Sequence, residues 1–116
     1  MLVLTRFRVP ESESAAFEDA AGAAIAVLAS RPGAESLDLV RNLDEPELWA
    51  IVGRWSDVGS YRRALGGMES KMVVVPLLSR AIDEPSAYLD PADVGANIPR
   101  GDDETDGLGW ALPGDR

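Results

Sequence analysis

Two tryptophans and a tyrosine in the middle of the chain are the residues whose types could bind and orient a flat aromatic molecule. Trp49, Ile51 and Trp55 share one face of a strand if side chains alternate with period two, and Gly53 leaves room beside them. Tyr61 follows Trp55 by six residues. Buried indole N–H and phenol O–H groups seek hydrogen-bond partners. The pattern indicates a pocket floor, although the same residues are also typical of a plain core under helices.

Acid–base chemistry at this place would depend on Tyr61, because its phenol can donate a hydrogen bond or a proton. An ordinary tyrosine pKa of about 10 makes it a weak base at neutral pH unless a cation assists. Arg80 is the arginine that we expect to supply such a charge, since Arg54 points to the other strand face. We therefore predict three catalytic residues (Trp55, Tyr61 and Arg80) and three substrate-binding residues (Phe7, Trp49 and Ile51).

The residue types that are missing exclude several kinds of chemistry. The sequence contains no histidine and no cysteine, which removes the commonest general base, the commonest metal ligand, thiolate nucleophiles and disulfides. Its acidic residues show no metal-ligand spacing, and there is no glycine-rich phosphate loop. Hydrolase and nucleotide-binding functions are thus disfavoured, and we expect no metal site.

The charge and hydropathy of the chain limit its partners and location. The 116 residues carry a net charge of −9, which repels nucleic acid and anionic membrane surfaces. The N-terminus lacks the apolar core of a signal peptide, and no stretch approaches the roughly 18 apolar residues of a membrane span. We expect a cytoplasmic protein that binds neither nucleic acid nor membrane.

The pattern of hydrophobic residues predicts an α+β domain over residues 1–89. Alternating residues, helical spacing and Pro or Gly breaks delimit the elements. The expected strands cover residues 1–9, 35–42, 47–55 and 81–89, and the expected helices cover residues 12–30 and a segment from Ser56 or Asp57. Residues 72–78 favour helix or irregular structure, because Pro76 outweighs three consecutive valines. The order β-α-β-β-α-β is that of a ferredoxin-like fold with an antiparallel sheet.

The last 27 residues, 90–116, form a segment of different composition. They contain seven of the 20 acidic residues but two of the 11 basic ones, and proline and glycine are frequent. Such a segment buries too little apolar area to offset its ordering entropy. We expect a flexible tail, in which Trp110 and Leu112 could form a short docking element.

Both faces of the expected sheet are apolar, which predicts a homodimer. Leu2 and Leu4 face away from Phe7, and Ala50 and Val52 face away from Trp49 and Trp55 by the same alternation. Helices can cover only one of these faces, and a second copy of the chain is the simplest cover for the other. Arg6 and Arg8 would then lie at the seam, with Asp38 or Glu84 as partners, or else at an exposed strand end.

Residues 1–89 resemble the antibiotic biosynthesis monooxygenase family of dimeric α/β barrels. The resemblance rests on short motifs in the right order: Arg31-Pro32-Gly33, Asp44-Glu45-Pro46, Arg54-Trp55 and Tyr61. It implies that Trp55 and Tyr61 match the Trp and Tyr with which the cofactor-free oxygenases of the family bind an aromatic substrate. The family's Asn, four residues before that Trp, is replaced by Ile51. Haem degradation, known in another branch, needs an axial histidine that this chain lacks.

The resemblance implies a cofactor-independent monooxygenase acting on a small aromatic or polyketide-like substrate. A non-catalytic dimer of the same fold, which binds a small molecule or a partner, is the alternative favoured by Ile51 and by the absence of histidine. The sequence alone leaves open whether the protein is an enzyme.

Overall fold

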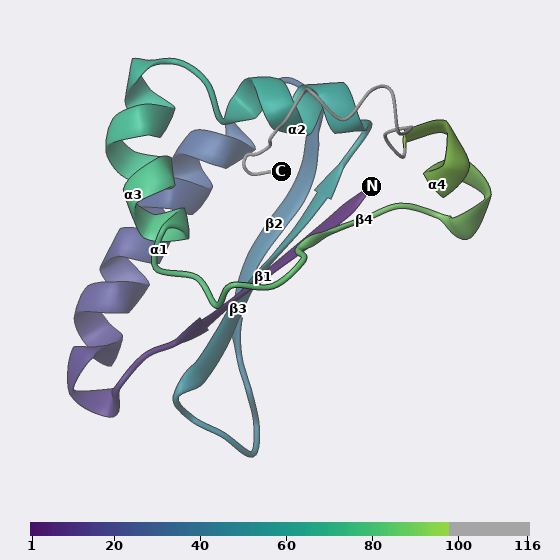
Figure 1. The fold of residues 1–116 in the computed structure, drawn as a ribbon. Helices are drawn as coiled ribbons and strands as arrows, with labels where there is room; N and C mark the ends of the chain where they lie inside the picture. The colour runs from purple at the N-terminus through teal and green to yellow at the C-terminus, as the bar shows by residue number, and fades with distance from the viewer. Residues whose placement is uncertain (98–116) are drawn as a thin grey trace.

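An antiparallel sheet, with all helices but the last on one side of it, makes up residues 1–97, the part of the chain that the computed structural model describes (Figure 1). The elements in order are β1 (Leu2–Arg8), η1 (Glu11–Glu13), α1 (Ser14–Ala29), β2 (Ala34–Arg41), β3 (Leu48–Trp55), α2 (Val58–Ala64), η2 (Ser70–Val74), α3 (Val75–Leu78), β4 (Ala87–Tyr88) and α4 (Pro91–Asn97). The strand order is β2-β3-β1-β4, and every neighbouring pair is antiparallel. The predicted ferredoxin-like α+β fold is confirmed.

Helix α1 forms because its apolar residues recur at helical spacing and face the sheet. Phe17, Ala21, Ala24 and Leu28 are buried, as the sequence pattern predicts. The helix ends just before Arg31-Pro32-Gly33, where Gly33 adopts a φ of 91° that a side chain would disfavour. A Cβ at this glycine would also collide with the Ser60 side chain, so the turn packs directly against α2.

Strands β2 and β3 form the predicted hairpin. The side-chain oxygen of Asn42 accepts hydrogen bonds of 2.8 Å from the backbone N–H groups of Asp44 and Glu45, which fixes the turn. Along β3, Trp49, Ile51, Gly53 and Trp55 are buried, while the residues that alternate with them are less so. The expected turn role of Asn42 and the expected alternation along β3 are therefore both confirmed.

The segment after β3 consists of two helical stretches that are separated by two glycines. Asp57 caps α2 by accepting a 2.7 Å hydrogen bond from the Ser60 N–H, and this bond lowers the pKa of the Asp57 carboxyl. Gly66 and Gly67 then separate α2 from η2, a π-helical turn that continues into α3. Pro76 lies in the first turn of α3, directly after the π-helical turn. The preference for helix over strand in residues 72–78 is confirmed.

A chain of two hydrogen bonds holds η2 against α1 and α2. The fully buried hydroxyl of Ser70 donates to the Ala64 carbonyl oxygen at 2.6 Å and accepts from Arg31 Nη2 at 3.1 Å. Since Ala64 is the last residue of α2 and Arg31 follows α1, this single serine connects three helical segments.

The prediction of a last strand over residues 81–89 is wrong in extent, because β4 comprises only Ala87 and Tyr88. Pro85 has no N–H to contribute to a ladder, and it interrupts the pairing. The segment before it still runs along β1, since Ile82 N–H donates to the Arg6 carbonyl at 2.9 Å.

The first part of the expected tail, Pro91–Asn97, forms helix α4. The composition of this segment did not predict a helix. Asp90 assists the helix start, because its side chain accepts a 2.9 Å hydrogen bond from Ala92 N–H. The expected flexibility of the remaining tail, and the expected docking element at Trp110 and Leu112, lie outside the described residues.

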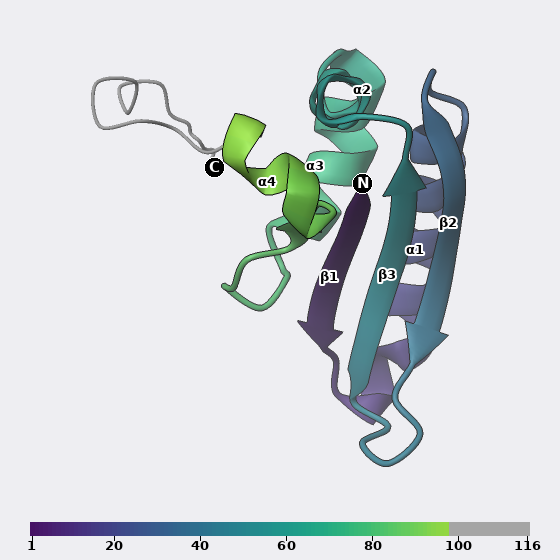
Figure 2. The ribbon, with the colours of Figure 1, turned by 90° about the vertical axis from the view of Figure 1, so that its right-hand side faces the viewer.

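Among residues 1–97, no helix packs against the central part of the other face of the sheet, which Figure 2 shows from the front with α1 behind it. This open face is defined by β1 and β3 residues that are half-buried in the single chain: Leu2, Leu4, Leu48, Ala50 and Val52. Val40, next to them on β2, is 45% exposed. Arg6 lies on this face, where its guanidinium forms two hydrogen bonds of 2.7 and 2.8 Å to Glu84 of the same chain.

Candidate functional site

A cavity lies between the inner face of the sheet and the three helices α1, α2 and α3. Its lining is almost entirely apolar and comes from strands and helices alike: Val3, Thr5, Leu28, Leu37, Ile51, Gly53, Trp55, Tyr61 and Leu78. The hollow has about 280 Å³ of empty space including its open mouth, but leaves only about 20 Å³ for the centre of a water molecule. In this conformation the cavity therefore has room for about one water.

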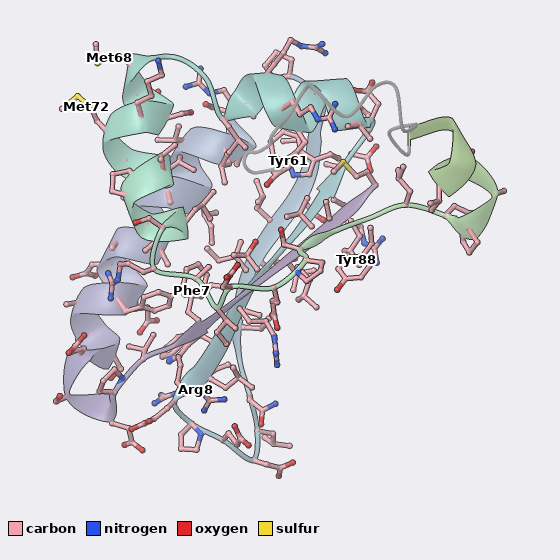
Figure 3. All side chains as sticks on the ribbon, in the orientation of Figure 1. Phe7, Arg8, Tyr61, Met68, Met72 and Tyr88 are labelled. Atoms are coloured by element: carbon pink, nitrogen blue, oxygen red, sulfur yellow. The ribbon has the colours of Figure 1, made fainter. Side chains whose placement is uncertain are left out.

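Trp55 and Tyr61 form one wall of this cavity. Trp55, the last residue of β3, is 1% exposed, and its ring centroid lies 5.7 Å from that of Tyr61 with an angle of 59° between the planes. Tyr61 comes from α2 and lies below that helix, towards the end of the sheet (Figure 3). Asp57 positions the ring by capping α2, because the cap fixes where the helix starts after β3.

Burial raises the pKa of the Tyr61 phenol above its usual value of 10.0. The phenol consequently keeps its proton at neutral pH and can act as a hydrogen-bond donor, whereas action as a base is disfavoured. No other residue that lines the cavity is ionisable, so none of them can serve as a general base.

Gly53 provides space next to the tryptophan. A Cβ at this position would lie 3.2 Å from Trp55 Nε1 and 3.0 Å from Leu37 Cδ2, closer than side chains normally pack. Gly53 thus allows the indole N–H of Trp55 to lie along the cavity floor, as the sequence pattern indicates.

Several predicted site residues belong instead to a second aromatic cluster at the hairpin end of the sheet. Phe17 of α1 is its centre, with ring centroids 5.0 Å from Phe7 and 5.4 Å from Trp49. The Arg80 guanidinium carbon lies 5.5 Å from the Phe17 ring, and that of Arg41 lies 4.6 Å from the Trp49 ring. These are cation–π contacts that close the hairpin end of the core.

The structure thus brings three of the six predicted site residues together around one cavity: Ile51, Trp55 and Tyr61. Phe7, Trp49 and Arg80 surround Phe17 instead, and none of them lines the cavity. Sequence reasoning missed Thr5, which lines the cavity from β1. The signal available was its place on the inner face with Val3 and Phe7, but a threonine there suggested only a strand.

Within residues 1–97 no group of three acidic side chains is placed to hold a metal ion. In the same part of the chain, no helix combines the length and apolarity needed to cross a bilayer. The cavity itself offers a ligand apolar walls and the uncharged hydrogen-bonding groups of its lining residues.

A family model for antibiotic biosynthesis monooxygenases matches residues 1–72, which include β1 to β3, α2 and the Trp55–Tyr61 pair. The chain belongs to the antibiotic biosynthesis monooxygenase family. The resemblance noted in the sequence is thereby confirmed. No curated protein matches the chain.

Solved structures share the fold of this member of the antibiotic biosynthesis monooxygenase family. SnoaB, a cofactor-independent oxygenase from Streptomyces nogalater, is 25% identical with a TM-score of 0.61, over 70% of this chain and 82% of SnoaB. A conserved protein from Methanosarcina mazei Go1 is 21% identical with a TM-score of 0.62, over 74% of this chain and 84% of that protein. The second similarity concerns the fold alone.

Proposed function

We propose that the protein is a cofactor-independent monooxygenase that oxidises a small aromatic or polyketide-like molecule in the cavity beside Trp55 and Tyr61. The observation that supports this most is the pairing of a buried indole and a buried phenol along one apolar cavity, in a chain of the antibiotic biosynthesis monooxygenase family. The similarity to SnoaB, a cofactor-independent oxygenase, agrees with this proposal.

An aromatic substrate needs more space than this conformation provides, so binding requires helices to move away from the sheet. Tyr61 on α2 and Leu78 on α3 are the lining residues whose elements are joined through Gly66 and Gly67. Gly67 adopts a φ of 86°, and glycines impose the least restraint on a change of backbone direction. We expect the ligand to enter by displacement of these segments while the strands stay fixed.

In the proposed reaction the substrate loses a proton, and its electron-rich anion passes electrons to dioxygen. One oxygen atom is incorporated into the product and the other leaves as water, so that a CH₂ group becomes a carbonyl. Because the cavity contains no base, the substrate must be acidic enough to ionise to water. Tyr61 would donate a hydrogen bond to the resulting oxyanion, and Trp55 would hold the ring in place. Arg80, predicted to stabilise this charge, contacts Phe17 and would act only from a distance.

A non-catalytic small-molecule-binding domain is the second candidate, and two observations favour it. Ile51 occupies the position where the family resemblance places an Asn, and no charged group lines the cavity. An anion in an apolar cavity is costly without a cation or several hydrogen bonds. Binding of a neutral ligand would be free of that cost.

Oxygen consumption distinguishes the two candidates. Wild-type protein would be supplied with anthrone-type phenols, which contain the required CH₂ group, and its rate of oxygen consumption compared with those of Tyr61→Phe and Trp55→Phe. Tyr88→Phe is a matched control, because Tyr88 is 48% exposed and lies outside the cavity. We expect the first two variants to be at least tenfold slower and the control to be unchanged. Equal rates in all four proteins would refute this site, and no uptake with any phenol would favour the binding domain.

The proposed functional unit is a homodimer formed through the open face. Leu4 and Val52 are cross-strand partners in its centre, and apolar area of this kind is stabilised by burial. Sedimentation equilibrium would compare wild type with Leu4→Glu. Met72→Glu is the control, since Met72 is 69% exposed and points outwards from the helices (Figure 3). A wild-type monomer at micromolar concentration, or a dimer that survives Leu4→Glu, would contradict the proposed interface.

A further inference from the structure

Thr5 is a buried polar residue of the cavity that the predicted site does not include. It is 8% exposed, lines the cavity from β1, and is the direct cross-strand partner of Ile51. Its hydroxyl forms no hydrogen bond within residues 1–97, and it is not one of the fully buried unpaired atoms there, which are Arg31 Nε and Trp49 Nε1. A hydroxyl is therefore present beside the very position at which this chain has Ile51 instead of a polar side chain.

The hydroxyl of Thr5 is therefore open to the cavity and not sealed in the core. Burial of a hydroxyl without a partner costs free energy, and valine has the same shape without that cost. The neighbours Val3 and Phe7 on the same strand face are apolar, as packing alone would favour. Thr5 thus adds to this face a polar group that packing does not require and to which a ligand in the cavity can bond.

The polar groups of the cavity lie at two separate levels of the sheet. Thr5 lies beside Ile51, while Trp55 is four residues further along β3, a distance of about 13 Å between backbones. The Trp55 indole N–H and the Tyr61 hydroxyl also have no hydrogen-bond partner among the described residues. Between the two levels the floor is Gly53 and the walls are aliphatic.

We infer that Thr5 determines specificity by binding a ligand oxygen at one end, while Trp55 and Tyr61 bind a second oxygen at the other end. The ligand class is then a flat, uncharged molecule with oxygen functions at opposite ends of an apolar body. This inference rests on the proposed function, because it assumes that the cavity opens for a ligand. It assigns to Thr5 a role in selecting the ligand, which is separable from any oxidation.

Two phenols of equal shape test the role of Thr5. 4-Hydroxybenzyl alcohol has a hydroxyl opposite the phenol, and 4-ethylphenol has a methyl group in its place. Dissociation constants for both would be measured by NMR titration on wild type, Thr5→Val and Thr5→Ser. Thr5→Val preserves the shape of the side chain, and Thr5→Ser preserves its hydroxyl.

The preference for the alcohol over 4-ethylphenol should fall about fivefold to tenfold in Thr5→Val, because one neutral hydrogen bond is lost. Thr5→Ser should retain most of the preference, and 4-ethylphenol alone should bind wild type and Thr5→Val alike. If both ligands bind but the preference is unchanged in Thr5→Val, the role of Thr5 is refuted while the cavity remains a ligand site. If wild type binds neither phenol in the cavity, the proposed function and this inference are both refuted.

Discussion

Removal of the Tyr61 hydroxyl should change how stability depends on alkaline pH. Burial raises the pKa of the Tyr61 phenol, so the folded protein keeps this proton at a pH where the unfolded chain has lost it. Below about pH 10 the phenol is neutral in both states, and its ionisation does not affect the unfolding equilibrium. As the pH rises through 10, the unfolded state alone releases the proton, and the folded state loses stability.

The size of this loss follows from the tyrosine pKa of 10.0 in the unfolded chain. At one pH unit above that value, the ionised unfolded state gains at most about 1.4 kcal/mol. The full amount applies if folded Tyr61 remains protonated. Tyr61→Phe has no ionisable group at this position and should lack this part of the pH dependence, whatever its stability at neutral pH.

Urea unfolding of wild type and Tyr61→Phe at about pH 9 and pH 11 would measure the difference. The alkaline titration is simple, because the sequence has two tyrosines, one lysine and no cysteine. Tyr88→Phe is the control, since it removes the other tyrosine, which is 48% exposed. If the free energy of unfolding falls by the same amount in wild type and in Tyr61→Phe between the two pH values, the pKa of Tyr61 is the same in the folded and unfolded states. The argument that it acts as a hydrogen-bond donor would then be wrong.

Three further changes test the site and its supports. Gly53→Ala should weaken phenol binding at least tenfold in an NMR titration, because the new methyl group fills the cavity floor. Unchanged binding would show that the phenol binds outside this cavity. Ser70→Ala should lower the free energy of unfolding by about 1–3 kcal/mol in urea, since the Ala64 carbonyl loses its buried donor. The Arg6 guanidinium lowers the pKa of Glu84, so the ion pair stabilises the fold above pH 4.5 and ceases to do so as acid protonates Glu84. Glu84→Gln should therefore reduce acid sensitivity in melting experiments, and an identical acid profile would contradict this.

Local patterns in the sequence predicted the elements well, because they depend on residues close together in the chain. The alternation along β3 and the Asn42 turn are of this kind, and both are as expected. The pairing of Thr5 with Ile51 depends instead on the register between β1 and β3, which are 46 residues apart at these positions. No local pattern encodes that register, and so the third polar residue of the cavity was missed.

Arg80 illustrates the same limit for charges. Its closeness in the chain to the helical segment suggested a place near Tyr61, but the direction of the chain after α3 brings it to Phe17. The shortness of β4 also depends on long-range geometry, since Pro85 interrupts a segment that still follows β1. Residue spacing was thus enough to predict the helices and strands. Which side chains contact one another could be known only from the three-dimensional fold.

The hydrogen-bond chain through Ser70 should affect affinity and stability in opposite directions. Arg31, Ser70 and Ala64 together hold the helical segments closed over the cavity. Each ligand molecule must be bound by the small fraction of protein in which these segments have moved apart, and its apparent affinity falls in proportion to that fraction. Removal of either hydrogen bond would lower the free energy of unfolding and raise the fraction of protein in which the cavity is open to a ligand. The tightest binder among single-site variants should therefore be sought among the less stable ones.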